Sequence, residues 1–140
     1  MELINQNPRP ESLERHKPKV LFIDDSADIL SLFSDIAPNN PRVVTAECHS
    51  LEDARQAIAA TSPDILFLDN SFSLNKGEDN AGLKLVTELL RRAPEIKIYS
   101  TTSDSNMAEE YEKIGIKHIK KFDIPRMEAI INSNEDPGEK

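Results

Sequence analysis

The chain has 140 residues, of which 38% are hydrophobic, and its 25 acidic against 17 basic residues give a formal net charge of −8 at pH 7. A chain of this length forms one domain with a sizeable core, and no apolar run approaches the roughly 20 residues that cross a bilayer. The negative charge disfavours nucleic acid and anionic membranes as partners. A single cysteine, Cys48, excludes an intramolecular disulfide, and without an apolar leader we expect a cytoplasmic protein.

Both ends of the chain are polar. Residues 1–18 hold three prolines and mixed charges, and residues 133–140 are short and mostly polar or acidic. Such segments bury too little apolar surface to order themselves. We therefore expect a flexible arm over 1–18, a folded domain over 19–132 and a disordered tail over 133–140.

Between these ends, short apolar runs alternate with amphipathic stretches. Strands are predicted over 20–23, 43–46, 65–68, 96–100 and, more weakly, 116–121. The first and third runs lack polar alternation, as expected for central parallel strands covered on both faces. Helical spacing follows each run, in the sets Ile29, Leu32, Phe33 and Ile36; Ala54, Ala57 and Ile58; Leu83, Val86, Leu89 and Leu90; Ala108, Tyr111 and Ile114; and a final helix over 123–132.

Five strand-helix units predict an α/β fold with right-handed crossovers. The expected architecture is a five-stranded, doubly wound parallel sheet of order 2-1-3-4-5, which is the flavodoxin-like arrangement of three αβα layers. In this order the direction of winding reverses between the first and third strands. A binding crevice is therefore expected at their carboxyl ends.

Acidic residues follow these two strands directly. Asp24 and Asp25 come after the first strand, and Asp69 comes after the third. Carboxylates that converge in one crevice repel each other unless a cation lies among them, and sites with only oxygen ligands suit Mg²⁺ or Mn²⁺. The alternative is that Asp25 or Ser26 simply caps the next helix.

Hydroxyl and ammonium groups extend this rim. The fourth strand ends in the segment 100–103 (STTS), and the fifth ends in Lys120 and Lys121. Carboxylates, a divalent ion, a hydroxyl and a lysine are the groups that phosphoryl transfer uses. Taken singly, the hydroxyls are also explained by local turns, and the lysines by protection of an edge strand.

The ordered set of these segments resembles the receiver domain of bacterial two-component response regulators, from residue 19 to about 132. VLFIDDS is similar to the first strand of that family with its acidic pair, and ILFLDNSF is similar to the third strand with its phosphoacceptor. GLKLVTELLRRAPEIKIYSTTS is similar to the following helix, strand and switch threonine.

The resemblance implies a role for each matching residue. Asp69 is the expected nucleophile, which takes a phosphoryl group from a histidine kinase or a histidine phosphotransfer protein. Thr102 and Lys121 are expected to bind phosphoryl oxygens, beside the small residue Ser103. The Mg²⁺ ligands are expected from Asp24, Asp25, Asp69 and the backbone carbonyl of Ser71, and Asp104 and Ser71 are expected to tune hydrolysis of the acyl phosphate.

The chain also departs from the family pattern. Phe122 stands where the family has a proline after its lysine, and the fifth strand is one residue short, so Lys120 competes with Lys121 for the active position. His118 stands where the family has a rotating aromatic residue, or is simply a half-exposed strand histidine. The long segment 70–81 is either a functional lid or a flexible insertion.

The resemblance implies a signalling protein that catalyses only its own phosphorylation and dephosphorylation. Because only a short polar tail follows residue 132, we expect a stand-alone receiver that binds a downstream protein through the face formed by 107–114, 118–121 and 124–132. Two alternatives remain open. One is a degenerate receiver that only binds other proteins, and the other is a phosphohydrolase of the haloacid-dehalogenase type, although Asp25-Ser26-Ala27 breaks the Asp-x-Asp motif of those enzymes.

Overall fold

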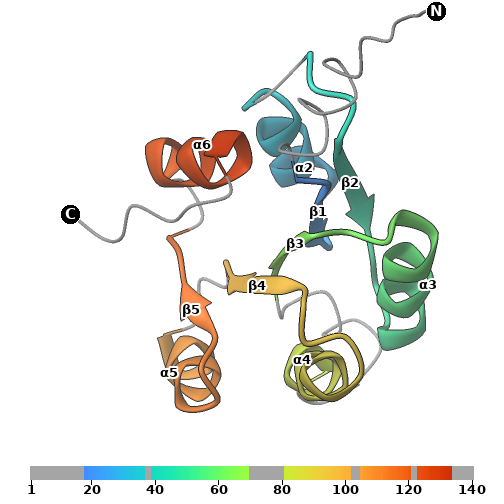
Figure 1. The fold of residues 1–140 in the computed structure, drawn as a ribbon, viewed down its shortest axis with the longest axis vertical. Coiled ribbons are helices and arrows are strands. Elements are labelled where there is room, and N and C mark those ends of the chain that lie inside the picture. The colour runs from blue at the N-terminus through green and yellow to red at the C-terminus, as the bar shows by residue number, and fades with distance from the viewer. Residues whose placement is uncertain (1–17, 37–38, 70–80, 102–104, 121–122, 134–140) are drawn as a thin grey trace, which may run out of the picture.

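The computed structural model describes residues 18–36, 39–69, 81–101, 105–120 and 123–133. Five parallel strands form one sheet in the order β2-β1-β3-β4-β5, which confirms the predicted topology (Figure 1). The strands are β1 (Val20–Asp24), β2 (Val43–Glu47), β3 (Ile65–Leu68), β4 (Lys97–Ser100) and β5 (Lys117–His118). The helices are α2 (Ala27–Ser34), α3 (Leu51–Thr61), α4 (Ala81–Arg92), α5 (Ser105–Lys113) and α6 (Ile124–Ser133).

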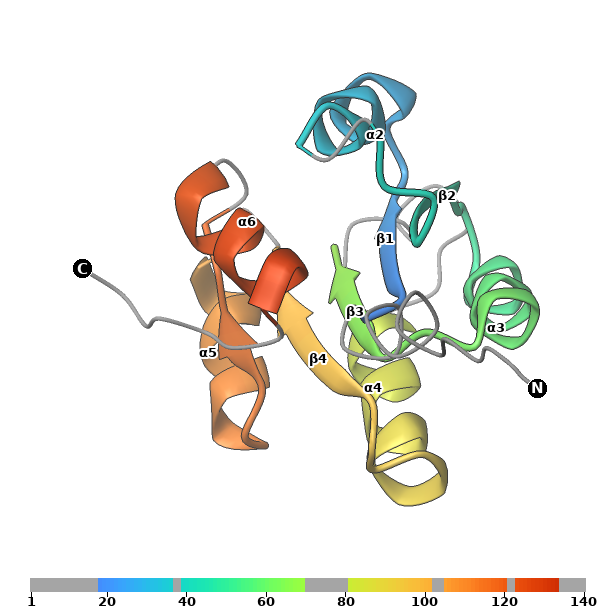
Figure 2. The ribbon, with the colours of Figure 1, turned by 45° about the horizontal axis from the view of Figure 1, so that its top comes forward.

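The helices cover both faces of the sheet, so the fold has the predicted three layers. Helices α2 and α6 lie on one face, and α3, α4 and α5 lie on the other (Figures 1 and 2). Every residue of β1 and β3 is buried, as the continuous apolar runs predict. Successive side chains of β1 alternate between the two layers, since Val20 and Phe22 join the α2/α6 core while Leu21 and Ile23 join the α3/α4/α5 core.

A column of aromatic rings organises the α2/α6 core. Phe33 of α2 stacks on Phe22 of β1 with ring centroids 4.5 Å apart, Phe22 stacks on Phe67 of β3 at 4.6 Å, and Phe67 stacks on Tyr99 of β4 at 5.4 Å. All four rings are buried. The column joins one helix to the three central strands, so it stabilises the part of the sheet on which the crevice is built.

Three predicted helix faces need correction. Leu30 and Phe33 are the buried residues of α2, whereas Leu32 is 47% exposed. Two residues along a helix turn the side chain by about 200°, so Leu32 lies nearly opposite Leu30. Leu90 of α4 is 39% exposed, and Ile114, which follows the end of α5, is 38% exposed.

The fifth strand is shorter than the predicted range 116–121. The ladder continues one residue past β5 through a hydrogen bond from the Ile119 amide to the Ser100 carbonyl, at 2.8 Å. The Lys120 carbonyl then accepts a hydrogen bond from the Asp123 amide at 3.0 Å. This bond closes a turn that leads into α6, so the strand ends there.

The ring column predicts a large difference between two apolar substitutions. Phe22→Ala removes a fully buried ring and is expected to lower the free energy of unfolding by about 3–5 kcal/mol. Leu32→Ala, on the exposed side of α2, is expected to change it by less than about 1 kcal/mol. Urea unfolding of both variants, followed by circular dichroism, provides the measurement, and equal losses would contradict the assignment of the core face.

Candidate functional site: an acidic cluster at the carboxyl edge of the sheet

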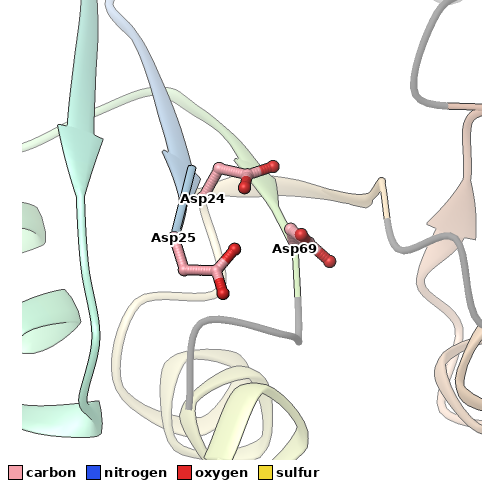
Figure 3. Close-up of side chains that lie close together, drawn as sticks. All are labelled: Asp24, Asp25 and Asp69. Carbon is pink, nitrogen blue, oxygen red and sulfur yellow. The ribbon is translucent and has the colours of Figure 1, made fainter. Parts of the chain in front are cut away.

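Three aspartates meet at the carboxyl ends of β1 and β3. Asp24 ends β1, and Asp69 follows β3, where its amide donates to the Ile23 carbonyl at 3.1 Å. Figure 3 shows the side chains of Asp24, Asp25 and Asp69 gathered around one space, and one carboxylate oxygen from each lies within 4.8 Å of the others. The structure thus brings together the three carboxylates that the sequence places after the first and third strands.

The turn after β1 explains how adjacent aspartates reach the same space. One oxygen of Asp24, Oδ1, accepts a hydrogen bond from the Ser26 amide at 3.0 Å, which bends the chain at once. Ser26 then caps α2, because its Oγ accepts from the Ile29 amide at 3.3 Å. Capping therefore falls to Ser26, and Asp25 remains directed toward the cluster (Figure 3).

The donor set fits a hard divalent cation. Asp24 and Asp69 are each only 1% exposed, and Asp25 is partly exposed. Gathering three carboxylates is costly, because like charges at this separation repel more strongly when water is excluded. Oxygen ligands at a partly open edge match the preference of Mg²⁺, which keeps several water ligands. In the described part of the chain, this is the one group of three or more metal-binding side chains close enough to share an ion.

The β3–β4 ladder places a threonine beside Asp69. Leu68 pairs with Ser100, and the Thr101 amide donates to the Leu68 carbonyl at 2.9 Å, so Thr101 is the next residue across from Asp69. Thr101 is fully buried, and its Oγ1 makes no hydrogen bond to the described residues. The family resemblance selects the adjacent Thr102 for this role, and because Thr102 lies outside the described residues, that assignment stays a prediction.

The remaining predicted site residues are mostly outside the described residues. These are Ser71, Thr102, Ser103, Asp104, Lys121 and the segment 70–80. Lys120 is described and exposed. His118 is half-buried on β5, with a buried Nδ1 that makes no hydrogen bond to any described atom. The choice between Lys120 and Lys121 therefore stays a prediction.

The negative charge of Asp69 affects the pKa of a buried tyrosine on α5. Tyr111 is fully enclosed in the α3/α4/α5 core. Burial, followed by the negative charge of Asp69, raises the pKa of its phenol. The phenol therefore resists ionisation even more strongly than a free tyrosine, which is itself neutral at physiological pH.

The comparison with family models identifies this arrangement. The model of the response regulator receiver domain matches residues 20–132. The chain belongs to this family. It is thus a receiver domain of two-component signalling, as its sequence resemblance implies.

Solved structures of receiver domains share its fold. The receiver domain of NtrX from Brucella abortus is 26% identical with a TM-score of 0.62, and the match covers 77% of this chain and 90% of that one. The BeF3 activated receiver domain of nitrogen regulatory protein C (NtrC) is 23% identical with a TM-score of 0.64, over 83% and 92% of the two chains. A search of curated proteins gave no significant match.

The receiver domain spans only part of some of these relatives. In a structure of NtrX from Brucella abortus that is 21% identical with a TM-score of 0.64, the match covers 84% of this chain but 27% of that one. No described helix of the present receiver domain has the length and apolar character needed to span a membrane.

The single cysteine is buried next to the acidic cluster. The Cys48 amide donates to the Asp24 carbonyl at 3.0 Å, and its side chain is 1% exposed. Burial, with added repulsion from Asp53 and Glu47, raises the pKa of the Cys48 thiol to about 12. At physiological pH the thiol is therefore protonated, and the thiolate that reacts with disulfides is scarce.

We predict that Cys48 in the folded receiver domain reacts with Ellman's reagent far more slowly than a free thiol. Because the raised pKa belongs to the folded state, the protection should persist until the pH nears the folded-state value and should vanish in denaturing urea. Absorbance during the reaction provides the measurement. Rapid labelling under native conditions would show that the thiol is accessible and ionised.

Proposed function

We propose that this receiver domain accepts a phosphoryl group on Asp69 from the phosphohistidine of a kinase or phosphotransfer protein, in a Mg²⁺-dependent reaction. The observation that carries the proposal is the convergence of Asp24, Asp25 and Asp69 within 4.8 Å at the carboxyl edge of β1 and β3. This chemistry needs a nucleophilic carboxylate and a metal ion in the same space. Two neighbouring carboxylates can hold that ion beside the nucleophile.

The transfer itself needs little covalent chemistry from the protein. A carboxylate oxygen of Asp69 forms a bond to phosphorus while the phosphorus–nitrogen bond of the donor breaks, and the imidazole keeps the electron pair and takes a proton. When bound, Mg²⁺ supplies positive charge to the phosphoryl oxygens, and Asp24, Asp25, Asp69 and the Ser71 carbonyl would hold it. The chain contributes mainly by positioning these groups.

A hydroxyl at the end of β4 is the proposed sensor of the new group. The position of Thr101 supports it for this role, since it is the described residue across the ladder from Asp69 and its hydroxyl is buried without a partner among the described residues. A phosphoryl group on Asp69 would supply an acceptor for that hydroxyl. Thr102, which the family resemblance selects, is the competing residue.

The proposed output is a change on the surface formed by α5, β5 and α6, within 107–114, 118–121 and 124–132. Phosphorylation adds close to two negative charges at Asp69, which lies close enough to Tyr111 of α5 for its charge to contribute, after burial, to the raised pKa of that phenol. A downstream protein that binds one state of this surface more tightly would read the change. We propose that the receiver passes its signal or its phosphoryl group to other proteins.

A degenerate receiver that only binds other proteins is the second candidate. The short β5 and the exposed Lys120 favour it, because an active receiver needs an ammonium group at the acidic edge. The three converging carboxylates favour the phosphoacceptor, since a purely structural role would not maintain their repulsion. Phosphorylation in solution separates the two candidates.

We predict that acetyl phosphate with Mg²⁺ adds one phosphoryl group to the wild-type chain, and that Asp69→Asn abolishes the adduct. The same substitution should keep the fold or stabilise it slightly, because it removes one of three repelling carboxylates. Intact-protein mass spectrometry detects the adduct. Asp28→Asn, at an exposed site on α2, is the matched control and should be phosphorylated normally; no adduct on the wild type would support the degenerate receiver.

We predict opposite effects of Thr101→Val on the two states. Without phosphate, removing a buried hydroxyl that lacks a described partner should leave the free energy of unfolding unchanged or raise it by about 1 kcal/mol. With Mg²⁺ and beryllofluoride as the phosphoryl mimic, the rise in Tm seen for the wild type should shrink. Thr102→Val is the comparison, and a loss confined to that variant would assign the role to Thr102.

A further inference from the structure

Helix α6 carries a basic residue where its neighbours are apolar. Arg126 is only 8% exposed, and it directly precedes Met127, the first of the fully buried core residues of α6. Arginine is rarely buried unless its guanidinium has specific partners. Its contacts therefore indicate what the residue does.

The guanidinium covers the open edge of the sheet. Arg126 Nη1 donates to the His118 carbonyl at 3.4 Å. Because the Ile119 amide donates to β4, the backbone groups of His118 point the other way, toward the edge of β5 where no other described strand pairs. The Arg126 side chain thus supplies a donor that a sixth strand would otherwise provide.

A second set of contacts ties the turn after β5 to the same helix. The Asp123 amide donates to the Lys120 carbonyl at 3.0 Å, and the Asp123 carbonyl accepts from the Met127 amide at 3.1 Å. Asp123 Oδ1 also accepts from the Arg126 amide at 3.4 Å. The end of β5 is therefore attached to the first turn of α6 at two points, His118 and Lys120.

We infer that Arg126 is a positioning residue, which fixes the end of β5 and thereby the starting direction of the lysine that serves the acidic site. The inference rests on the proposed function, because that lysine matters only if Asp69 is phosphorylated. A lysine side chain is long and flexible, so its ammonium reaches a phosphoryl group reliably only from a fixed backbone. Misplacing such a group by about 1 Å costs up to about a hundredfold in rate.

The first arm of the test does not depend on phosphorylation. Amide hydrogen exchange is compared between Arg126→Met and Arg92→Met, a matched removal of an arginine that is 72% exposed on α4. Arg126→Met should speed exchange of the Asp123 and Ile119 amides by about tenfold, the equivalent of one lost hydrogen bond, and should leave the Asp69 amide unchanged. Unchanged exchange at Asp123 and Ile119 would overturn the inference.

The second arm asks whether Arg126 acts through the lysine. Phosphorylation by acetyl phosphate and Mg²⁺ is timed for Arg126→Met alone and combined with Lys120→Ala or Lys121→Ala. Alone, Arg126→Met should make phosphorylation about tenfold slower, or more, than in the wild type. Combined with the lysine substitution that itself slows the reaction, it should cause no further loss of rate. Arg126→Lys, which keeps the charge, should recover part of the rate.

The outcomes distinguish failure of the positioning role of Arg126 from failure of the proposed function. A loss that is equally large in both lysine variants would show that Arg126 only stabilises the fold, and would overturn its positioning role. A wild-type chain that takes no phosphoryl group would refute the proposed function, and the exchange arm would then decide by itself whether Arg126 fixes the end of β5.

Discussion

Repulsion among the carboxylates of Asp24, Asp25 and Asp69 is the constraint on which the functional edge of this receiver domain depends. The β1–β3 ladder holds two of them at fixed register, through the bond from the Asp69 amide to the Ile23 carbonyl. The Asp24–Ser26 hydrogen bond turns Asp25 into the same space. Such an arrangement persists only if the surrounding structure opposes the repulsion, and it favours any cation or electrophile that relieves it.

The packing of the hydrophobic core beneath the cluster opposes this repulsion. Phe22 and Phe67 occupy the strands that end in Asp24 and Asp69, and their rings stack at 4.6 Å within the column that Phe33 and Tyr99 extend. Burial of these rings contributes several kcal/mol to the same ladder that holds the aspartates. The core and the site are therefore linked mechanically, since loosening the column would let the carboxylates separate.

The sequence was sufficient for the sheet order because five strand-helix units favour the doubly wound arrangement. It was sufficient for the acidic cluster because the aspartates come directly at the ends of continuous apolar strands. It was insufficient where neighbours differ only in register or rotation. Thr101 and Thr102 are adjacent hydroxyl residues, and the β3–β4 pairing alone shows that Thr101 lies across from Asp69. Leu32 fits a helical apolar pattern but lies on the wrong side of α2, and the partners of Arg126 depend on the way α6 packs against the open edge of β5.

These contacts also suggest how a charge at Asp69 would spread through the molecule. Asp69 is joined to β4 through the ladder that positions Thr101, and its charge reaches the buried phenol of Tyr111 on α5. Adding negative charge in surroundings of low dielectric is unfavourable unless donors move toward it, and a buried hydroxyl such as that of Thr101 is a suitable donor. A shift of Thr101 would pull on Ser100, to whose carbonyl the Ile119 amide is bonded. Because Arg126 donates to the His118 carbonyl, which belongs to the same peptide group as the Ile119 amide, movement at the end of β4 would be transmitted through β5 to α6.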